Sequence, residues 1–257
     1  MSHWQNKVVL ITGASSGIGR GLAIELARRG AAVGLVARRE DMLAEIVQQI
    51  SSVNGKAFAL PADVNDAGSL KARVDRFGIE AGPIDVLIAN AGIGGGVMHA
   101  SQLNPARIAN VINVNVLGAV NSVAAVLPGM VERGSGQLVA ISSLSGYRGL
   151  PKSAAYCASK AALSCFFESL RIDLRDSGVV VTIIHPGFIK TPLTAGRHSK
   201  MPFLMELDDG VDRIIRAIEK QKKTYAFPWQ LASVVRLGMI MPTFMYDRIA
   251  SRSSFRE

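Results

Sequence analysis

Tyr156 and Lys160 are the residues whose types and spacing best suit proton transfer in this sequence. Residues four apart lie on one face of a helix, and Ser153–Asp176 is predicted to be a single long helix. A tyrosine alone has a pKa of about 10, but a neighbouring ammonium group stabilises the phenolate and lowers that pKa. Ser143 follows a predicted strand, where its hydroxyl can donate a hydrogen bond to a carbonyl oxygen. Together these side chains favour proton exchange at a carbonyl or alcohol, although a Tyr-x-x-x-Lys pair taken alone is more often a surface pair.

A glycine-rich segment links the first predicted strand, Lys7–Thr12, to the first predicted helix, Gly17–Arg29. Its glycines permit a tight turn, close approach of the backbone to a diphosphate, and close packing of the helix on the strand. The start of the helix offers free N–H groups to phosphate. The Gly-Lys-Ser/Thr of a mononucleotide P-loop is absent, and the alternative is a simple turn. The candidate dinucleotide-binding residues are Gly13, Ser15, Ser16, Gly17, Ile18 and Gly19.

Two arginines, Arg38 and Arg39, follow the second predicted strand, Ala31–Ala37. A site for NAD usually places a carboxylate at the end of this strand to bind the ribose hydroxyls, and Ala37 provides none. Guanidinium groups suit a 2′-phosphate, which arginine binds with two hydrogen bonds. The pair therefore predicts NADP(H) as the cofactor, and the alternative is two solvated arginines before a helix.

These motifs occur in a fixed order together with three others: Asn90-Ala91-Gly92, Asn115-x-x-Gly118 and Pro186-Gly187. In order and spacing the set resembles the short-chain dehydrogenase/reductase family over about residues 7–192. The resemblance implies that Tyr156 is the general acid and base and that Ser143 polarises the substrate carbonyl. It also implies that Lys160 lowers the pKa of the tyrosine and binds the nicotinamide ribose, and that Asn115 holds a water molecule in a proton relay.

The same resemblance implies three groups of cofactor contacts besides the glycine-rich segment. Asp63 and Val64 would contact the adenine. The residues Asn90, Ala91 and Gly92 would pass under the ribose, and the residues Pro186, Gly187, Ile189 and Thr191 would frame the nicotinamide.

Three departures from the family pattern limit these expectations. Ala89 stands where the family often has a second asparagine, and Ser16 stands where many NADP-using members have a basic residue. The NADP(H) prediction therefore rests on Arg38 and Arg39. The Gly-Gly ending of the acyl-carrier-protein reductases is also absent, which lowers the expectation of a role in fatty-acid synthesis.

Short apolar runs alternate with longer helical patterns, so the elements that position these motifs form a repeated strand–helix order. Strands that are apolar throughout are buried on both faces, as in a parallel sheet. We therefore expect a doubly wound α/β fold of the Rossmann type, with about seven strands and helices on both faces, whose ligands bind beyond the carboxyl ends of the strands. Further strands are predicted at Ala57–Leu60, Ile84–Ala89, Gln137–Ser142 and Val179–Ile184, and further helices at Glu40–Val53, Asp66–Ala81 and Pro105–Glu132.

Composition excludes several classes of protein. Hydrophobic residues make up 49% of the 257 residues and charged residues 19%, a balance that disordered chains do not have. One domain over 1–257 is expected. The formal net charge is +9, but no run resembles a nucleic-acid-binding arm. Lys220, Lys222 and Lys223 are the densest basic cluster, which is typical of a solvated helix end, with an anionic ligand or an acidic membrane surface as the alternatives.

The two cysteines, Cys157 and Cys165, lie eight residues apart in one predicted helix, about 12 Å along its axis and too far for a disulfide. Reduced thiols and a cytoplasmic location are expected, and no metal-binding spacing is present. The uncharged stretch Ile108–Val131 is long enough to span a bilayer, but it contains four asparagines and a proline, so we expect a buried helix of a soluble protein.

The last quarter of the chain, 193–257, is expected to be a substrate-lid and C-terminal region of the same domain. It holds five of the nine methionines, which suit apolar sites of adaptable shape. We expect a mobile lid at 193–206 and a helix over Leu231–Ile249 broken near Pro242. Beyond Trp229 the mixture of apolar residues and arginines is also typical of a peripheral membrane segment, a less favoured interpretation.

The combined prediction is an NADP(H)-dependent oxidoreductase that interconverts a carbonyl and a secondary alcohol on an apolar small-molecule substrate, expected to be a bulky ketone or aldehyde. A homodimer or homotetramer is expected for two reasons: members of the family commonly pair through the helix predicted over Ser153–Asp176, and that helix carries the apolar residues Leu163, Phe166, Phe167 and Leu170. No nucleic-acid partner is expected. One alternative is a non-catalytic dinucleotide-binding regulatory or scaffold protein of the same fold. A nucleotide-sugar epimerase or dehydratase ranks lower, because only 65 residues follow Pro192.

Overall fold

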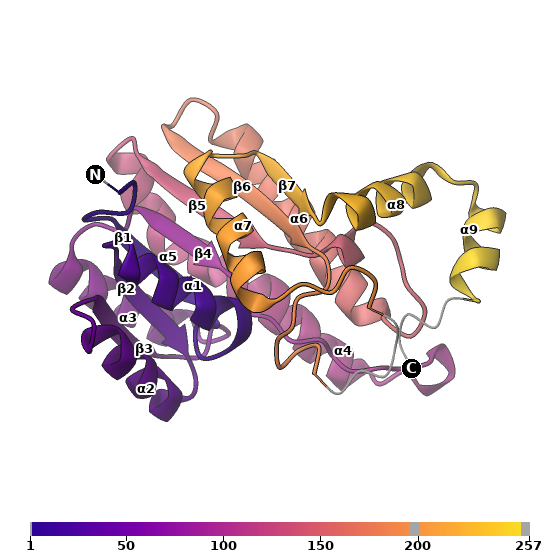
Figure 1. Cartoon of the computed structure of the whole chain (residues 1–257), viewed down its shortest axis with the longest axis horizontal. Helices are drawn as coiled ribbons and strands as arrows, with labels where there is room; N and C mark the ends of the chain where they lie inside the picture. Colours follow the sequence, from indigo (N-terminus) through magenta and orange to yellow (C-terminus); the bar gives the residue numbers. More distant parts are fainter. Residues whose placement is uncertain (1, 196–200, 253–257) are drawn as a thin grey trace.

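The protein is described by a computed structural model over residues 2–195 and 201–252. Its strands pair in parallel in one sheet, in the order β3-β2-β1-β4-β5-β6-β7 (Figure 1). The order reverses at β1 and β4, so the predicted doubly wound sheet is confirmed. The strands are β1 Val8–Thr12, β2 Ala32–Ala37, β3 Lys56–Pro61, β4 Val86–Ala89, β5 Gly136–Ile141, β6 Val179–Pro186 and β7 Thr224–Phe227.

Helices cover both faces of the sheet (Figure 1). One hydrophobic core lies between the sheet and α1, α2 and α7, and a second lies between the sheet and α3, α5 and α6. The strands supply both cores in alternation: Val9 and Ile11 of β1 enter the first, while Val8 and Leu10 enter the second. The helices are α1 Gly17–Arg28, α2 Glu40–Ser51, α3 Ala67–Ala81, α4 Pro105–Ile112, α5 Gly118–Glu132, α6 Ala154–Asp173, α7 Leu207–Glu219, α8 Trp229–Ile240 and α9 Thr243–Ala250.

Two elements, α7 and β7, have no counterpart among the elements predicted individually. β7 is short and lies at the edge of the sheet after a lysine-rich turn, and its first residue, Thr224, is exposed. Such a strand lacks the continuous apolar run by which the central strands were recognised. The expected helix over Leu231–Ile249 is present as α8 and α9, with the expected break at Pro242.

The helical region predicted over Pro105–Glu132 is divided by a π-helical turn at Asn113–Leu117, which joins α4 to α5. By length and composition this region could cross a membrane. In the fold, however, α5 packs Ala119, Val123 and Val126 into the second core. The burial predicted for this region is therefore observed in α5, whereas α4 is largely exposed, with only Val111 buried.

The four apolar residues of α6 that suggested self-association are covered within the chain. Leu163 and Phe167 are buried in the second core, and Phe166 and Leu170 are half-buried against it. These side chains therefore leave less apolar surface for a partner than expected, because the fold buries Leu163 and Phe167 fully and Phe166 and Leu170 in part. A homodimer or homotetramer remains a prediction that rests on the family resemblance and on exposed apolar residues such as Ile172 of the same helix.

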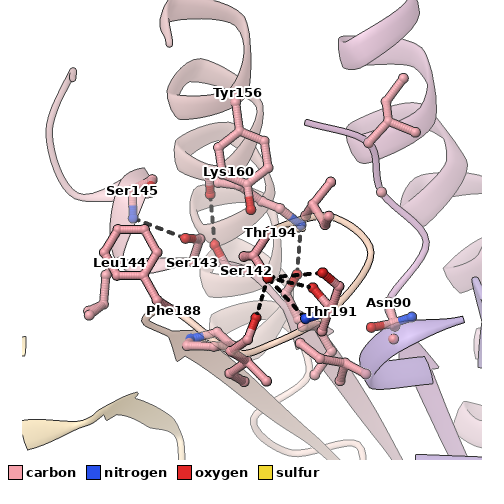
Figure 2. A pocket seen from close by; sticks show the side chains of 18 of the residues that line it. Asn90, Ser142, Ser143, Leu144, Ser145, Tyr156, Lys160, Phe188, Thr191 and Thr194 are labelled. Carbon is pink, nitrogen blue, oxygen red and sulfur yellow. Dashed lines mark hydrogen bonds between the residues drawn. The ribbon is translucent and has the colours of Figure 1, made fainter. Parts of the chain in front are cut away.

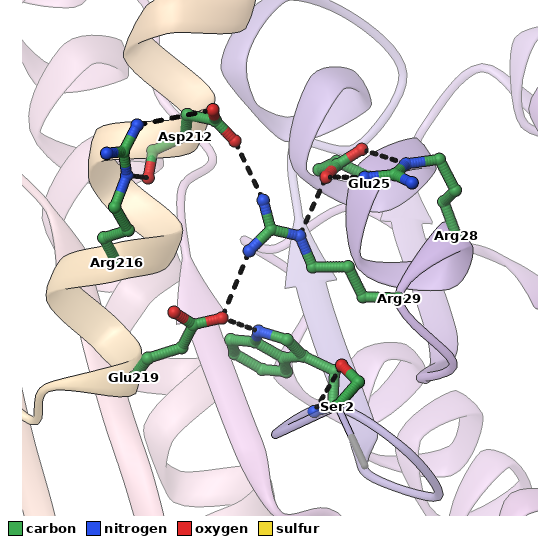
Figure 3. A network of polar contacts seen from close by, with 8 residues as sticks. Ser2, Glu25, Arg28, Arg29, Asp212, Arg216 and Glu219 are labelled. Atoms are coloured by element: carbon green, nitrogen blue, oxygen red, sulfur yellow. Dashed lines mark hydrogen bonds and ion pairs between the residues drawn. The ribbon is translucent and has the colours of Figure 1, made fainter.

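A polar network joins the N-terminus, α1 and α7 at the end of the sheet where β1 and β2 begin (Figure 3). Arg29 makes ion pairs with Glu25, Asp212 and Glu219 at 2.8, 2.8 and 3.1 Å. The fully buried Trp4 donates its indole N–H to Glu219 at 2.7 Å. Hydrogen bonds from Arg28, and further ones from Arg29, lower the pKa of Glu25 from 4.5 to about 2.

Replacing Glu25 with glutamine is expected to lower the free energy of unfolding by about 1 kcal/mol at pH 7, a value discounted for solvent screening. Because the folded-state pKa of Glu25 lies below its unfolded value, its stabilisation is complete above about pH 4.5 and is lost as the pH falls toward 2. Urea unfolding of both proteins at several pH values checks this. The control is Glu80→Gln, because the exposed ion pair of Glu80 with Arg76 should contribute less to the free energy of unfolding. The prediction would be contradicted if the difference in free energy of unfolding between the wild type and Glu25→Gln grew as the pH falls.

Candidate active site

A cavity of about 650 Å³ lies at the carboxyl ends of the central strands, where the strand order reverses. It runs from the glycine-rich segment after β1, past the start of α6, to the C-terminal helices. Of the predicted site residues, Gly19 and Asn115 alone do not line it. Those that do are Gly13, Ser15, Ser16, Gly17, Ile18, Arg38, Arg39, Asp63, Val64, Asn90, Ala91, Gly92, Ser143, Tyr156, Lys160, Pro186, Gly187, Ile189 and Thr191.

Ser143, Tyr156 and Lys160 meet at the centre of this cavity (Figure 2). The predicted i, i+4 arrangement is present on α6, and all three side chains are largely buried. The Lys160 amine donates to the carbonyl oxygen of Ile141 at 2.8 Å and lies 5.9 Å from the centre of the Tyr156 ring. Burial lowers the pKa of Lys160 to about 8, so most of this lysine is charged at pH 7. A cation is thus held beside the tyrosine with little water around it.

The two consecutive serines after β5 have different surroundings. Ser142 donates to the backbone oxygen of Lys160 at 3.0 Å and lies 2.7 Å from the hydroxyl of Ser164, so it ties β5 to α6. Both serines line the cavity, and the hydroxyl of Ser143 accepts a hydrogen bond from the backbone N–H of Ser145 at 3.1 Å. Consecutive residues of an extended chain point in opposite directions, which separates the structural serine from the candidate catalytic one.

Asn115 lies fully buried in the π-helical turn, behind the cavity wall. Its side-chain oxygen accepts from the N–H of Ile93 at 2.7 Å, and its amide donates to Ile93 O at 3.0 Å and to Ser159 at 2.9 Å. The side chain therefore joins the segment after β4 to α6, next to Lys160. This is a positioning role, and the water relay expected from the family resemblance remains a prediction.

The glycine-rich segment has the geometry of a phosphate cradle. Gly13 has a positive φ of 67°, and a Cβ atom there would lie 2.7 Å from the Cα of Ala91. A Cβ on Gly19 would lie 2.3 Å from the oxygen of Gly13, so close packing of helix on turn requires glycine at both positions. Asn90 secures the turn from β4 by donating to the oxygens of Thr12 and Gly13 at 2.9 and 3.2 Å.

The N-terminus of α1 is open to an anion. Its N-cap residue, Ser16, makes no side-chain capping bond, and the first turn has no acidic residue. The starts of α3 and α4, in contrast, are capped by the side chains of Asp66 and Asn104. Uncapped N–H groups carry partial positive charge and bind phosphate when a ligand supplies it. The residues present therefore fit the diphosphate of a dinucleotide.

Arg38 and Arg39 line the end of the cavity beside the glycine-rich segment. Arg39 donates to the hydroxyl of Ser15 at 3.0 Å, and Arg38 lies 3.8 Å from the carboxylate of Asp63. Both arginines are exposed, so neither is committed to a buried pair. Their positions suit a phosphate that enters between them and the glycine-rich segment.

His185, at the end of β6, lies beneath the site. Its Nδ1 lies 3.4 Å from the carbonyl oxygen of Ser143, and its ring lies 4.7 Å from that of Tyr147. Burial lowers the pKa of His185 to about 4, so the ring is neutral at pH 7 and supports the Ser143 segment by packing. Over residues 2–195 and 201–252, no three His, Cys, Asp or Glu side chains gather as a metal site.

The predicted lid, 193–206, is described at its two ends, and residues 196–200 lie outside the described residues. At the first end Thr194 donates to Ile189 O at 2.7 Å. At the second end Met205 pairs with Ile189, and its backbone oxygen accepts from Lys190 N–H at 2.9 Å. Both ends are therefore anchored next to the predicted nicotinamide frame, and mobility of the lid remains a prediction.

The helices α8 and α9, here called the C-terminal arm (residues 229–250), form a wall of this cavity that was not predicted from the sequence. Figure 1 shows the arm extending beyond the edge of the sheet. The excess of methionine and other apolar residues in this part of the chain was the available signal. The cavity-lining residues of the arm are Leu231, Val234, Val235, Leu237, Gly238, Met241, Tyr246, Ile249 and Ala250.

Arg148, in the loop before α6, fastens the arm to the rest of the site, and nothing in the sequence indicated this role. Its guanidinium donates to the carbonyl oxygens of Gly238 and Met241, the latter at 3.0 Å, and lies 3.9 Å from the centre of the Tyr246 ring. The Tyr246 hydroxyl in turn donates to Gly149 O at 2.5 Å. A cation at the carbonyl-rich end of α8 also interacts favourably with the helix dipole. The loop and the arm thus hold each other in place.

Comparison with known proteins agrees with this geometry. A family model described as short chain dehydrogenase matches residues 7–202. An uncharacterised oxidoreductase of Myxococcus xanthus is 44% identical over 98% of this chain and 99% of its own. The ketoacyl reductase HetN of a Nostoc species is 38% identical over 97% of this chain and 90% of its own.

Solved structures show the same likeness. A 3-ketoacyl-ACP reductase from Sinorhizobium meliloti is 29% identical, with a TM-score of 0.78 over 86% of this chain and 96% of its own. A 3-oxoacyl-[acyl-carrier protein] reductase from Brucella melitensis, solved with bound NAD, is 29% identical, with a TM-score of 0.78 over 88% of this chain and 90% of its own.

Proposed function

The chain belongs to the short chain dehydrogenase family of oxidoreductases, and from this premise we propose that it interconverts a carbonyl and a secondary alcohol on an apolar substrate with NADP(H). One observation carries the proposal. Ser143, Tyr156 and Lys160 lie in a cavity that has two arginines at one end and the apolar C-terminal arm at the other.

The cofactor supplies the hydride when it is bound. In the direction of reduction, the Ser143 hydroxyl donates a hydrogen bond to the carbonyl oxygen of the substrate. The Tyr156 hydroxyl gives its proton to that oxygen as the alcohol forms. Lys160, held by Ile141 O, keeps a positive charge near the phenolate that Tyr156 becomes. In oxidation the same groups act in reverse.

We propose an apolar substrate because the C-terminal arm forms an apolar wall of the cavity. Leu231, Val234 and Met241 offer aliphatic and thioether surface to whatever extends beyond the catalytic centre. The similar proteins named ketoacyl reductases act, by their names, on carbonyl groups carried by acyl chains, and a chain of this kind fits such a wall. The alternative, a non-catalytic dinucleotide-binding protein, has no need of the three catalytic side chains.

A series of 2-alkanones of increasing length with NADPH tests the proposed function. Burial of hydrocarbon contributes about 25 cal/mol per Å², so KM is expected to fall by up to roughly fourfold per added methylene until the cavity is filled. The rate is followed by the absorbance of the reduced nicotinamide. Best turnover of small polar carbonyl compounds would contradict the apolar substrate, and no turnover of any carbonyl or alcohol would favour the non-catalytic alternative.

Replacing Arg148 with methionine is expected to raise KM for a long 2-alkanone about tenfold, since hydrogen bonds to a charged group contribute about 1.5–3 kcal/mol and the arm loses its fastening. The kcat/KM for a ketone too short to reach the arm should stay within about twofold, because the catalytic residues are untouched. Arg175→Met, which removes an exposed charge, is the control. Equal losses for the short and the long ketone would show that Arg148 supports the catalytic centre instead.

A further inference from the structure

The C-terminal arm also carries large apolar side chains that do not line the cavity. Trp229 and Ile240 of α8 and Phe244 of α9 are 71%, 80% and 74% exposed. Met239 and Met245 are also exposed, and none of the five lines the cavity. We call these five residues the outer apolar face of the arm.

The charges around the outer apolar face are almost all positive. α8 has one charged residue, Arg236, which is exposed and lies seven residues after Trp229 and four before Ile240, on the same side of the helix. In α9, Arg248 lies four residues after Phe244 in the same way. Over residues 229–252 three arginines face a single acidic residue, Asp247.

We propose that the outer apolar face lies on an anionic lipid surface, with its apolar side chains at the depth of the acyl chains and its arginines among the phosphates. An exposed tryptophan with large aliphatic residues and arginines on one side of a helix is the pattern of an interfacial segment. α8 has 12 residues and is about 18 Å long, too short to span a hydrocarbon core of about 30 Å. The arm therefore lies in the interface and does not cross it.

Charge favours a lipid surface over a second copy of the chain. A two-fold contact through this face would place Arg236 and Arg248 of both copies in one interface, with Asp247 as the only opposite charge in the arm. The net charge of +9 adds to that repulsion. Anionic headgroups supply the missing negative charge and accept the apolar side chains as well.

The position of the cavity adds a functional reason that rests on the proposed function. The cavity is walled by the same two helices, through residues such as Leu231 and Met241. An apolar ketone concentrates in a bilayer. An arm that lies on the bilayer therefore brings the cavity close to the place where such a substrate collects.

The two tryptophans make a direct test. Trp4 is fully buried and bonded to Glu219, whereas Trp229 is exposed on the outer apolar face. Adding phosphatidylcholine vesicles that contain phosphatidylglycerol should shift the emission of the whole protein to the blue and carry the protein down on centrifugation. Trp229→Phe should abolish the shift and keep the emission of Trp4. Vesicles of phosphatidylcholine alone should bind more weakly, and added salt should release the protein.

Variants separate the contributions of the arm. Ile240→Ser with Phe244→Ser should abolish sedimentation with the vesicles, and Arg236→Gln with Arg248→Gln should weaken binding by about fivefold per arginine. Ile79→Ser, at a position of α3 that is 86% exposed, and Arg76→Gln on the same helix are the matched controls. Turnover of a short, water-soluble ketone without vesicles should be unchanged in all of them and shows that each is folded.

Several outcomes would overturn the proposal. One is an emission spectrum unchanged by either kind of vesicle. Equal binding to neutral and anionic vesicles would overturn the role of the arginines. A third outcome combines two results: the parent protein does not bind vesicles, and the mass measured by light scattering falls when Ile240 is replaced. This outcome would assign the outer apolar face to a contact with a second copy of the chain. Vesicle binding is measured independently of turnover. Absence of vesicle binding would therefore not contradict the proposed function, and inactivity on every carbonyl compound would not contradict membrane binding.

Discussion

Replacing Tyr156 with phenylalanine is expected to lower kcat by about 10²–10⁴, the usual cost of losing a general acid, while Kd for NADPH changes little. The substitution removes one hydroxyl and keeps the ring, which is almost fully buried on α6. Stopped-flow or steady-state rates with a 2-alkanone give kcat, and quenching of protein fluorescence by NADPH gives Kd. Loss of turnover together with retained cofactor binding is the expected signature of a residue that acts in the chemical step.

Tyr147→Phe is the matched control for this experiment. Tyr147 packs its ring 4.7 Å from His185, close to the site, but it does not line the cavity. Removing its hydroxyl should leave kcat within about threefold, because the ring packing is kept. If Tyr156→Phe were as active as Tyr147→Phe, the proton would have to come from another group.

Lys160 is assigned two roles, so its replacement should have a different signature. Lys160→Met removes the buried cation that lies 5.9 Å from the Tyr156 ring and leaves Ile141 O without its donor at 2.8 Å. Both kcat and the affinity for NADPH should fall, whereas Tyr156→Phe should lower kcat alone. This difference separates the proton donor from the residue that supports it.

Local spacing explains why the arrangement of the candidate catalytic residues could be predicted from the sequence. Tyr156 and Lys160 belong to one helix, and their relative position depends only on helix geometry. The glycine-rich segment likewise lies between a strand and a helix that are adjacent in sequence. The doubly wound sheet follows from strand–helix alternation, which is a local pattern repeated along the chain.

Features that depend on distant contacts could not be predicted. Arg148 bonds to Gly238 and Met241, about ninety residues further along the chain, and no spacing rule relates these positions. In the π-helical turn, Asn115 bonds to Ile93 and Ser159, which lie in distant parts of the chain. The different surroundings of Ser142 and Ser143 depend on the backbone of α6 at Lys160.

The apolar residues of α6 are covered more fully than the sequence indicates. Leu163, Phe166, Phe167 and Leu170 predict more apolar surface than one sheet face covers. The sheet and the neighbouring helices cover all four, wholly or in part. A helix that packs on a broad twisted sheet and on neighbouring helices buries more than one stripe, so an apolar excess in such a helix does not by itself predict a partner.

NADPH is expected to be preferred over NADH by about 10- to 100-fold in kcat/KM. The two dinucleotides differ only in the 2′-phosphate, and a hydrogen bond to a charged group contributes about 1.5–3 kcal/mol. Arg39 is directed toward the glycine-rich segment by its bond to Ser15 at 3.0 Å, and Arg38 lines the same end of the cavity. Ala37 has no carboxylate to repel the phosphate or to bind the ribose hydroxyls of NADH.

Variants at these positions test the origin of the preference. Arg38→Ala with Arg39→Ala should bring the ratio of kcat/KM values close to one by weakening NADPH and leaving NADH almost unchanged. Ala37→Asp should lower the ratio further, since a carboxylate there repels the phosphate and accepts bonds from the ribose. Arg20→Gln, on α1 but outside the cavity lining, is the charge-matched control and should keep the parent ratio. A ratio near one in the unmodified protein, or a double variant that still prefers NADPH, would mean that Arg38 and Arg39 are solvated surface residues and do not select the cofactor.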